Sequence, residues 1–197
     1  WVTQTVVTVD GKTTTTETGF EPNTGKTETT GIRDNKENEP VAKVELDKNK
    51  LNKTTVKFVY KIRVTNEGEI EGYATEITDY IPEGLAYINY YNTNVDNLWK
   101  LSNELDADQT MNLVGENGFY KTEEDVKNFE LDDFTGITSL EEVQLVTGEI
   151  KLTTNELNDK LIKAFDKNKT EEEEGWQKAE TGDGGLYYKD VQISCLV

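Results

Sequence analysis

Residues 55–65 read TVKFVYKIRVT, and this run contains the clearest structural pattern in the chain. Apolar side chains occupy every second position from Val56 to Val64, whereas two lysines, one arginine and Val59 fill the positions between them. Alternation with a period of two is typical of a strand that has one face in the core and the other toward solvent. We therefore predict a half-buried antiparallel strand over residues 55–65.

Strand-like runs recur on both sides of this segment. WVTQTVVTV, at the start of the chain, is rich in β-branched side chains, and Asp10-Gly11 after it is a hairpin turn signal that leads into the polar run KTTTTET. In the closing run LYYKDVQISCLV, every second residue from Tyr187 to Val197 shares one face, which includes Lys189. Further strands are predicted at residues 41–46, 72–79, 86–90 and 148–153.

Two stretches depart from the strand pattern. Alternation fades over residues 92–147, where short helical signals appear, so we interpret this stretch as an irregular insertion. Leu157, Leu161 and Phe165 then recur at intervals of four residues, which predicts one short peripheral helix over residues 155–166. The expected fold is mainly β: a single antiparallel β-sandwich domain over residues 1–197, with that helix and that insertion.

The chain is strongly acidic, with 39 Asp and Glu against 21 Lys and Arg and a formal net charge of -18. Such a surface repels the phosphate backbone, so a nucleic-acid partner is not expected. It also disfavours anionic membrane surfaces, and no apolar run approaches membrane-spanning length. A soluble module, expected to be a monomer, fits this charge best.

The composition removes the usual catalytic groups. The chain has no histidine, the commonest general base and transition-metal ligand, and its one cysteine, Cys195, has neither a disulfide partner nor a histidine to activate it. Acidic residues are so frequent that carboxylate pairs arise by chance, and glycoside hydrolysis depends on their separation in space. We therefore predict no catalytic residue and no enzymatic activity.

Two aspartate pairs are the candidate metal ligands, namely Asp106 with Asp108 and Asp132 with Asp133. A calcium loop needs several oxygen ligands at fixed offsets together with a turn glycine. After the first pair that position is Met111. No cofactor is therefore expected, and Ca²⁺ at these aspartates is the alternative.

Residues 58–88, FVYKIRVTNEGEIEGYATEITDYIPEGLAYI, carry a recognisable motif: a strand ending in Val-Thr-Asn, a glycine turn, and a strand ending in a Pro-x-Gly-Leu corner. The motif residues are Tyr60, Ile62, Val64, Thr65, Asn66, Gly68, Asp79, Ile81, Pro82, Gly84 and Leu85. This motif resembles the conserved-repeat, immunoglobulin-like β-sandwich domains of bacterial cell-surface proteins of the Firmicutes type. The closing strand resembles the last strand of that family.

The resemblance implies a place and a role. Such domains are extracellular and are attached to the cell wall or cell surface through other parts of their polypeptide. They serve as structural stalks or adhesive modules, with neighbouring domains of the same polypeptide and host or cell-wall proteins or carbohydrates as partners. The alternative function is a ligand-binding module in which residues 92–147 hold a protein or a carbohydrate.

Related surface modules also contain intramolecular isopeptide bonds, which need a buried lysine, an Asn or Asp, and a catalytic carboxylate. Lys189, on the apolar face of the last strand, is the candidate lysine, and Asp79 is the candidate acid. The sequence indicates no partner amide. The alternative is that Lys189 is a solvent-facing strand lysine.

Aromatic residues cluster where the insertion begins. Tyr90, Tyr91 and Trp99 are candidates for ligand-facing side chains, because exposed aromatics often anchor protein or carbohydrate ligands. The alternative is that Tyr87 and one of these three belong to the core.

Overall fold

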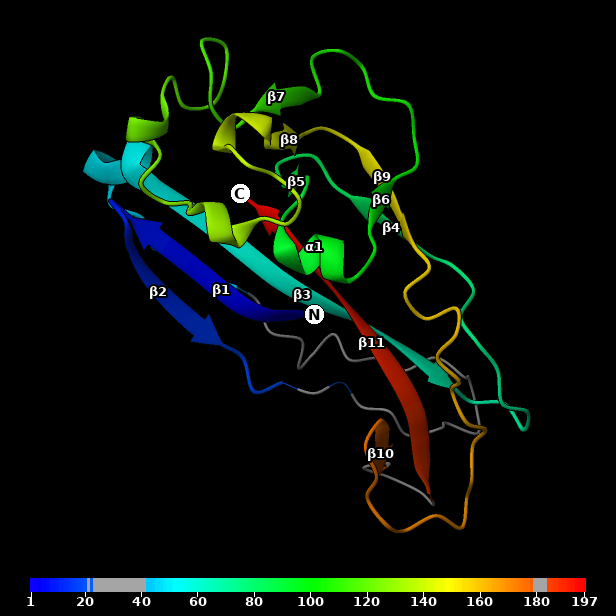
Figure 1. The fold of residues 1–197 in the computed structure, drawn as a ribbon. Helices are drawn as coiled ribbons and strands as arrows, with labels where there is room; N and C mark the ends of the chain where they lie inside the picture. Colours follow the sequence, from blue (N-terminus) through cyan, green and yellow to red (C-terminus); the bar gives the residue numbers. More distant parts are fainter. Residues whose placement is uncertain (21, 23–41, 179–183) are drawn as a thin grey trace.

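The structure is a computed structural model that describes residues 1–20, 22, 42–178 and 184–197. Two antiparallel sheets dominate it, with the orders β2-β1-β3-β11-β5-β8-β7, where β10 also pairs with β11, and β4-β9-β6 (Figure 1). The strands of the larger sheet are β1 (Val2–Val9), β2 (Lys12–Glu17), β3 (Thr54–Asn66), β5 (Ala86–Ile88), β7 (Thr110–Asn112), β8 (Gln144–Val146), β10 (Trp176–Lys178) and β11 (Gly185–Leu196). The smaller sheet contains β4 (Ile77–Ile81), β6 (Lys100–Leu101) and β9 (Ile150–Thr154). The expected mainly β, antiparallel sandwich is confirmed.

Five short helical segments complete the described chain. The α-helix α1 covers Asn92–Asp96, inside the insertion. The 3₁₀ turns are η1 (Lys48–Lys53), η2 (Glu123–Asp125), η3 (Leu131–Asp133) and η4 (Leu140–Glu142). None of the helices in the described ranges is long and apolar enough to cross a membrane.

The long strands β3 and β11 pair side by side along the middle of the larger sheet, as their alternation predicts. Tyr60 lies opposite Ile193 and Ile62 lies opposite Val191. These side chains face the smaller sheet, where they pack with Ile150 and others in the first core cluster. Burial of alternating apolar side chains between two sheets is the main stabilising contribution to a sandwich of this kind.

The first two strands form the expected hairpin. Asp10 and Gly11 form its two-residue turn and have φ values of 50° and 78°. Positive φ at both central residues defines the turn type that matches the twist of paired strands, and Asp-Gly is a favoured sequence for it. β1 pairs with β3 on its other side, so β2 becomes the outer strand of the sheet.

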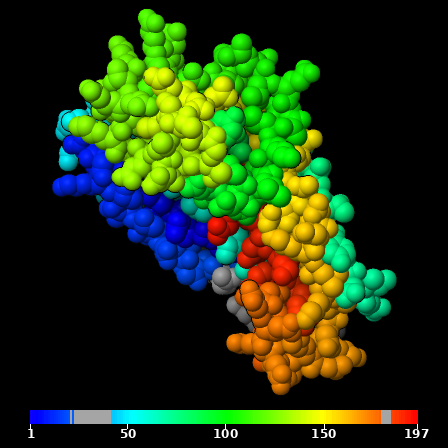
Figure 2. All heavy atoms as spheres, in the orientation of Figure 1, coloured from blue at the N-terminus to red at the C-terminus, as the bar shows by residue number. Residues whose placement is uncertain are grey.

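The insertion contributes β6 to the smaller sheet and β7 and β8 to the larger sheet, and the rest of it packs beside them. Its apolar residues build a second core cluster around Leu113, Phe134 and Val143, and this cluster includes Ile88 of β5 and Leu196 of β11. Figure 2 shows the insertion as a thick mass of green and yellow-green atoms over one end of the molecule. The end of β11 is therefore buried on both of its faces.

The motif residues build turns and core contacts. Asn66 accepts a hydrogen bond from the Gly68 N–H at 2.9 Å and donates to the Ile70 carbonyl at 2.9 Å, which shapes the glycine turn. At the Pro82 corner, Leu85 N donates to the Pro82 carbonyl at 3.3 Å.

The predicted helix over residues 155–166 does not form. A turn follows β9, and the chain then extends so that Ile162 forms an isolated bridge with Gly72 through two backbone hydrogen bonds of 2.8 and 3.1 Å. Leu157 and Ile162 are buried in this conformation. Tertiary pairing and burial override the local four-residue periodicity, which is a weak prior for helix.

Two strand predictions also need correction. Residues 42–46 are not a strand, and Val41 lies outside the described residues. The strand predicted over 72–79 instead covers Ile77–Ile81, and Tyr73 is exposed rather than part of an inward face. The strand starts late because the turn shaped by Asn66 extends to Ile70 and pairing with β9 begins only at Ile77.

Candidate functional site

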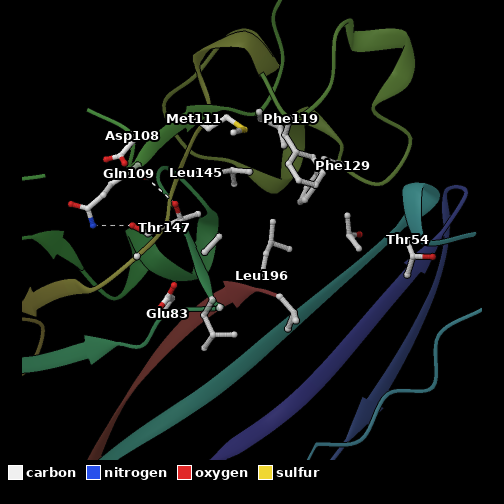
Figure 3. Close-up of a pocket in the computed structure, with 17 residues that line it drawn as sticks. Thr54, Glu83, Asp108, Gln109, Met111, Phe119, Phe129, Leu145, Thr147 and Leu196 are labelled. Carbon is white, nitrogen blue, oxygen red and sulfur yellow. Dashed lines mark hydrogen bonds between the residues drawn. The ribbon is translucent and has the colours of Figure 1, made fainter. Parts of the chain in front are cut away.

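The insertion and the sandwich enclose an apolar cleft of about 500 Å³ at the end of β11 (Figure 3). The start of β3, the β4–β5 turn, the β7–β8 ladder and the last two residues of the chain form its walls. The residues that decide its character are Met111, Leu113, Phe119, Phe129, Leu145 and Leu196. Four separate regions of the sequence therefore meet at this cleft.

The floor of the cleft is part of the second core cluster. Leu113, Phe129 and Leu145 are buried, with exposed fractions of 8% or less. At the mouth, Phe119 is 60% exposed and Met111 is 44% exposed. Two large apolar side chains on the surface beside a buried apolar floor are typical of a binding site, because exposed apolar patches are costly in water.

Polar groups fix one rim of the cleft. The Gln109 amide donates to the Thr147 carbonyl at 3.0 Å, and its oxygen accepts from Asp106 N at 2.9 Å. Gly148 has a φ of 85°, and a Cβ there would lie 2.7 Å from the Gln109 nitrogen. The position of the Gln109 side chain, and with it the shape of this rim, therefore depends on the absence of a side chain at Gly148.

The same mouth is acidic. Glu83 and Asp108 both line the cleft, and Figure 3 shows their carboxylates on the side of the cleft occupied by Gln109. The described lining residues include no lysine or arginine to offset them. An apolar floor with an acidic rim favours a ligand that combines an apolar group with positive charge.

Capped 3₁₀ turns and ring contacts hold the insertion in place. At the start of η4, Ser139 accepts a hydrogen bond from Glu141 N at 3.2 Å, and the Glu142 carboxylate accepts from Ser139 N at 3.0 Å. The Phe134 ring packs edge-on against Tyr91 at a centroid distance of 5.6 Å and lies 6.0 Å from Phe129. Reciprocal capping and aromatic packing stabilise short segments that lack longer secondary structure.

The candidate aromatics divide between core and surface. Tyr91 and Trp99 are buried, with exposed fractions of 6% and 5%, and Tyr90 is 38% exposed with a φ of 68°. The Trp99 indole N–H donates to the Gln192 carbonyl at 2.7 Å. None of the three lines the apolar cleft. Tyr90 alone of the three keeps a surface position.

Tyr91 has a charged neighbour on β3. The Lys57 ammonium donates to the Tyr91 hydroxyl and lies 4.3 Å from the centre of its ring. Burial lowers the pKa of Lys57, and the charge of Asp133 acts in the opposite direction. Burial also raises the pKa of the Tyr91 hydroxyl. This pair therefore links β3 to the residue that immediately precedes the insertion.

The four candidate aspartates lie at two separate places. Asp106 and Asp108 precede β7 beside the cleft rim, whereas Asp132 and Asp133 belong to η3. The Asp133 carboxylate accepts a hydrogen bond from Glu130 N at 2.9 Å and so caps its own turn. Within the described ranges, no three Asp, Glu or Cys side chains gather as a metal site would require.

Lys189 and Asp79 lie at different positions along β3. Lys189 is opposite Val64, whereas Asp79 accepts a hydrogen bond from the Tyr60 hydroxyl at 3.4 Å. Val64 and Tyr60 are four residues apart, or roughly 13 Å along a strand. The structure does not bring the candidate lysine and acid together.

The sequence predicts an irregular insertion over residues 92–147, but it does not single out the residues of that stretch that line the cleft. Phe119 lies in GENGFY, a turn-rich run without periodicity, and Phe129 lies in the irregular stretch over residues 92–147. Neither residue has a local signal for its role, because the cleft forms only when the insertion packs against β5 and β11.

Comparison with known proteins gives no match to a family model, to a curated protein or to a solved structure.

Proposed function

We propose that this chain is a non-catalytic adhesive module of a bacterial cell-surface protein, acting outside the cell. In this proposal, residues 92–147 supply a cleft that holds an apolar side chain of a protein ligand. The observation that carries the proposal is the apolar cleft with Phe119 and Met111 exposed at its mouth.

The surface-module part is supported by the motif between Tyr60 and Leu85. Its residues form core contacts, a glycine turn and a Pro-Gly corner, which are structural tasks with no chemistry. This agrees with the resemblance to the immunoglobulin-like repeats of such proteins, in which the sandwich acts as a scaffold. A scaffold with a variable insertion is a common way to present a binding surface.

Binding is favoured over a purely structural stalk because the insertion is compact and concave. It has its own buried cluster, and that cluster continues into the floor of the cleft. A protein ligand is favoured over a carbohydrate because leucine, methionine and valine provide most of the apolar lining. Sugars stack on flat exposed rings, and Phe119 is the one strongly exposed ring among the lining residues.

A neutral apolar dye tests the cleft directly. Nile red should bind with one saturable site, and Phe119→Ser together with Met111→Ser should weaken that binding at least tenfold. Tyr73→Ser removes an exposed aromatic residue outside the cleft and should leave binding unchanged. Equal binding by all three proteins would rule out the cleft as a site.

Adhesion is tested with beads that carry the purified chain. Beads should attach to protein-coated or host-cell surfaces, and the Phe119→Ser, Met111→Ser variant should lose most of that attachment while keeping its melting temperature. Attachment that persists in this variant but is lost after enzymatic removal of surface glycans would favour a carbohydrate ligand. No attachment by the unaltered chain would favour the stalk role.

A further inference from the structure

Among the residues that the structure describes, strand β2 has no partner on its outer edge. All six of its residues are exposed, and β1 is the only strand of the described chain that pairs with it. The central residues are four consecutive threonines, with Lys12 before them and Glu17 after them. Exposed edges of this kind are usually protected by a bulge, a proline or an inward-pointing charge, and the register of β1 with β2 is regular throughout.

The residues of β2 that hydrogen-bond to β1 alternate with residues whose backbone groups face outward, and the hairpin turn decides which are which. With a two-residue turn, Val9 and Lys12 form a hydrogen-bonded pair, so the bonds to β1 recur at alternate residues of β2. The Thr18 N–H donates to the Thr3 carbonyl at 2.9 Å, which confirms this phase. The N–H and C=O groups of Thr13, Thr15 and Glu17 therefore point away from β1.

The turn of the hairpin is held against the rest of the molecule. Gly11 N donates to the Asn128 side chain at 3.0 Å, and the Asp10 carboxylate lies 3.3 Å from the Lys127 ammonium. Asp10 N also donates to the Lys53 carbonyl at 2.9 Å. The outer edge is therefore a fixed template, which lowers the entropic cost of pairing with another strand.

We infer that β2 pairs antiparallel with β2 of a second copy, about a two-fold axis at Thr15. Opposed residues in an antiparallel ladder must both direct their bonds across the shared edge. A register centred on Thr15 satisfies this rule, because it places Thr15 opposite its own counterpart and Thr13 opposite the partner's Glu17. In this register all three outward-facing residues form hydrogen-bonded pairs with outward-facing residues of the partner. In a register centred on Thr14, fewer of them do.

Charge supports a second copy as the occupant of this edge. Two chains of net charge -18 repel each other over most of their surfaces, but β2 has one lysine and one glutamate and so no net charge. In the proposed register Lys12 is opposite Thr18 and Glu17 is opposite Thr13. No like charges are opposed, and threonine pairs across an antiparallel ladder are favourable.

The predicted monomer and this pairing are compatible. A single strand pair buries much less surface than a stable dimer requires, so the monomer dominates at low concentration and the dimer forms at high local concentration. β2 contributes no residue to the apolar cleft, so the inference is independent of ligand binding there.

Cysteine cross-linking tests the register. Opposed Cα atoms of a hydrogen-bonded pair are about 5.5 Å apart, which suits a disulfide. Thr15→Cys should give a disulfide-linked dimer under mild oxidation at least tenfold faster than Thr78→Cys, an exposed residue of β4. Equal rates would reject the pairing, and a faster reaction of Thr14→Cys would reject the register. Cys195 is fully buried and should not interfere.

Proline substitution tests the backbone contribution without cross-linking. Thr15→Pro removes an outward N–H and leaves the bonds to β1, which an edge strand tolerates. Sedimentation equilibrium should show at least tenfold weaker dimerisation for Thr15→Pro, and Thr15→Val should dimerise like the unaltered chain. The pairing is wrong if the chain stays monomeric at millimolar concentration, or if Thr15→Pro dimerises as well as Thr15→Val while keeping its melting temperature.

Discussion

Asn94 satisfies both backbone groups of Ser194 with one side chain. Its Oδ1 accepts from Ser194 N at 2.8 Å, and its Nδ2 donates to the Ser194 carbonyl at 3.0 Å. The same Nδ2 donates to the Ile88 carbonyl at 3.0 Å. Asn94 is fully buried and lies in α1, so the insertion provides β11 with a substitute for a strand partner beyond the end of β5.

Replacing Asn94 should therefore destabilise the whole domain. Asn94→Ala leaves one buried N–H and two buried carbonyls without partners, each at a cost of about 1–3 kcal/mol. We expect a loss of about 3 kcal/mol or more in the free energy of unfolding, measured by urea denaturation. The exposed Asn158 provides the control, and Asn158→Ala should change stability by less than about 0.5 kcal/mol. A loss below about 1 kcal/mol for Asn94→Ala would show that the bridge contributes little.

Ser194 offers a prediction of the opposite sign. Its hydroxyl is buried and has no hydrogen-bond partner among the described residues. Removing an unsatisfied buried polar group should stabilise the fold, so Ser194→Ala should raise the free energy of unfolding by about 1 kcal/mol. Ser102→Ala, which removes an exposed hydroxyl that donates to the Lys151 carbonyl at 3.2 Å, should not stabilise. Destabilisation by Ser194→Ala would mean that the hydroxyl has a partner.

The thiol of Cys195 should be unreactive in the folded chain. Burial raises the pKa of its thiol to about 12, so almost no thiolate is present at pH 8. Labelling with a chromogenic disulfide reagent should be negligible in the native state and complete within seconds in denaturant. The exposed thiol of Thr78→Cys should react at once under native conditions. Fast native labelling of Cys195 itself would contradict its burial.

Glu173 should titrate far below other glutamates. Hydrogen bonds from Lys163 and Lys169 lower the pKa of its carboxyl from 4.5 to about 2. A depressed folded-state pKa means that the carboxylate contributes its stabilisation above pH 4.5 and loses it as the pH falls toward 2. The contribution is small because these side chains are exposed to solvent. NMR titration of the carboxyl carbon should show the low pKa, and Lys163→Met should move it toward 4.5.

The fold was predictable from the sequence in some places and not in others. The β3–β11 pair and the Asp10-Gly11 hairpin were predictable because their signals are local: alternation along a strand and turn chemistry at two residues. The extended conformation at Ile162 was not, because it depends on pairing with Gly72, 90 positions earlier in the chain.

The candidate site shows the same division. Long alternating runs stop at Asn92, and the stretch that follows has only the short strands β6, β7 and β8, but the residues that line the cleft carry no local signal. For Tyr91 and Trp99 the sequence left a ligand-facing and a core position open, and the structure buries both against partners that are distant in sequence, Lys57 and Gln192. Which aromatic side chain is buried is decided by packing between segments, and a single sequence does not encode those pairs locally.

The position of β3 between β1 and β11 has a mechanical consequence. Both neighbours run antiparallel to β3, so they run parallel to each other, and they hold it through two long ladders. A force that pulls the start of β1 and the end of β11 in opposite directions acts along the strands. The interstrand hydrogen bonds are then loaded in shear and must break together rather than one after another. This arrangement makes the central three strands resistant to stretching.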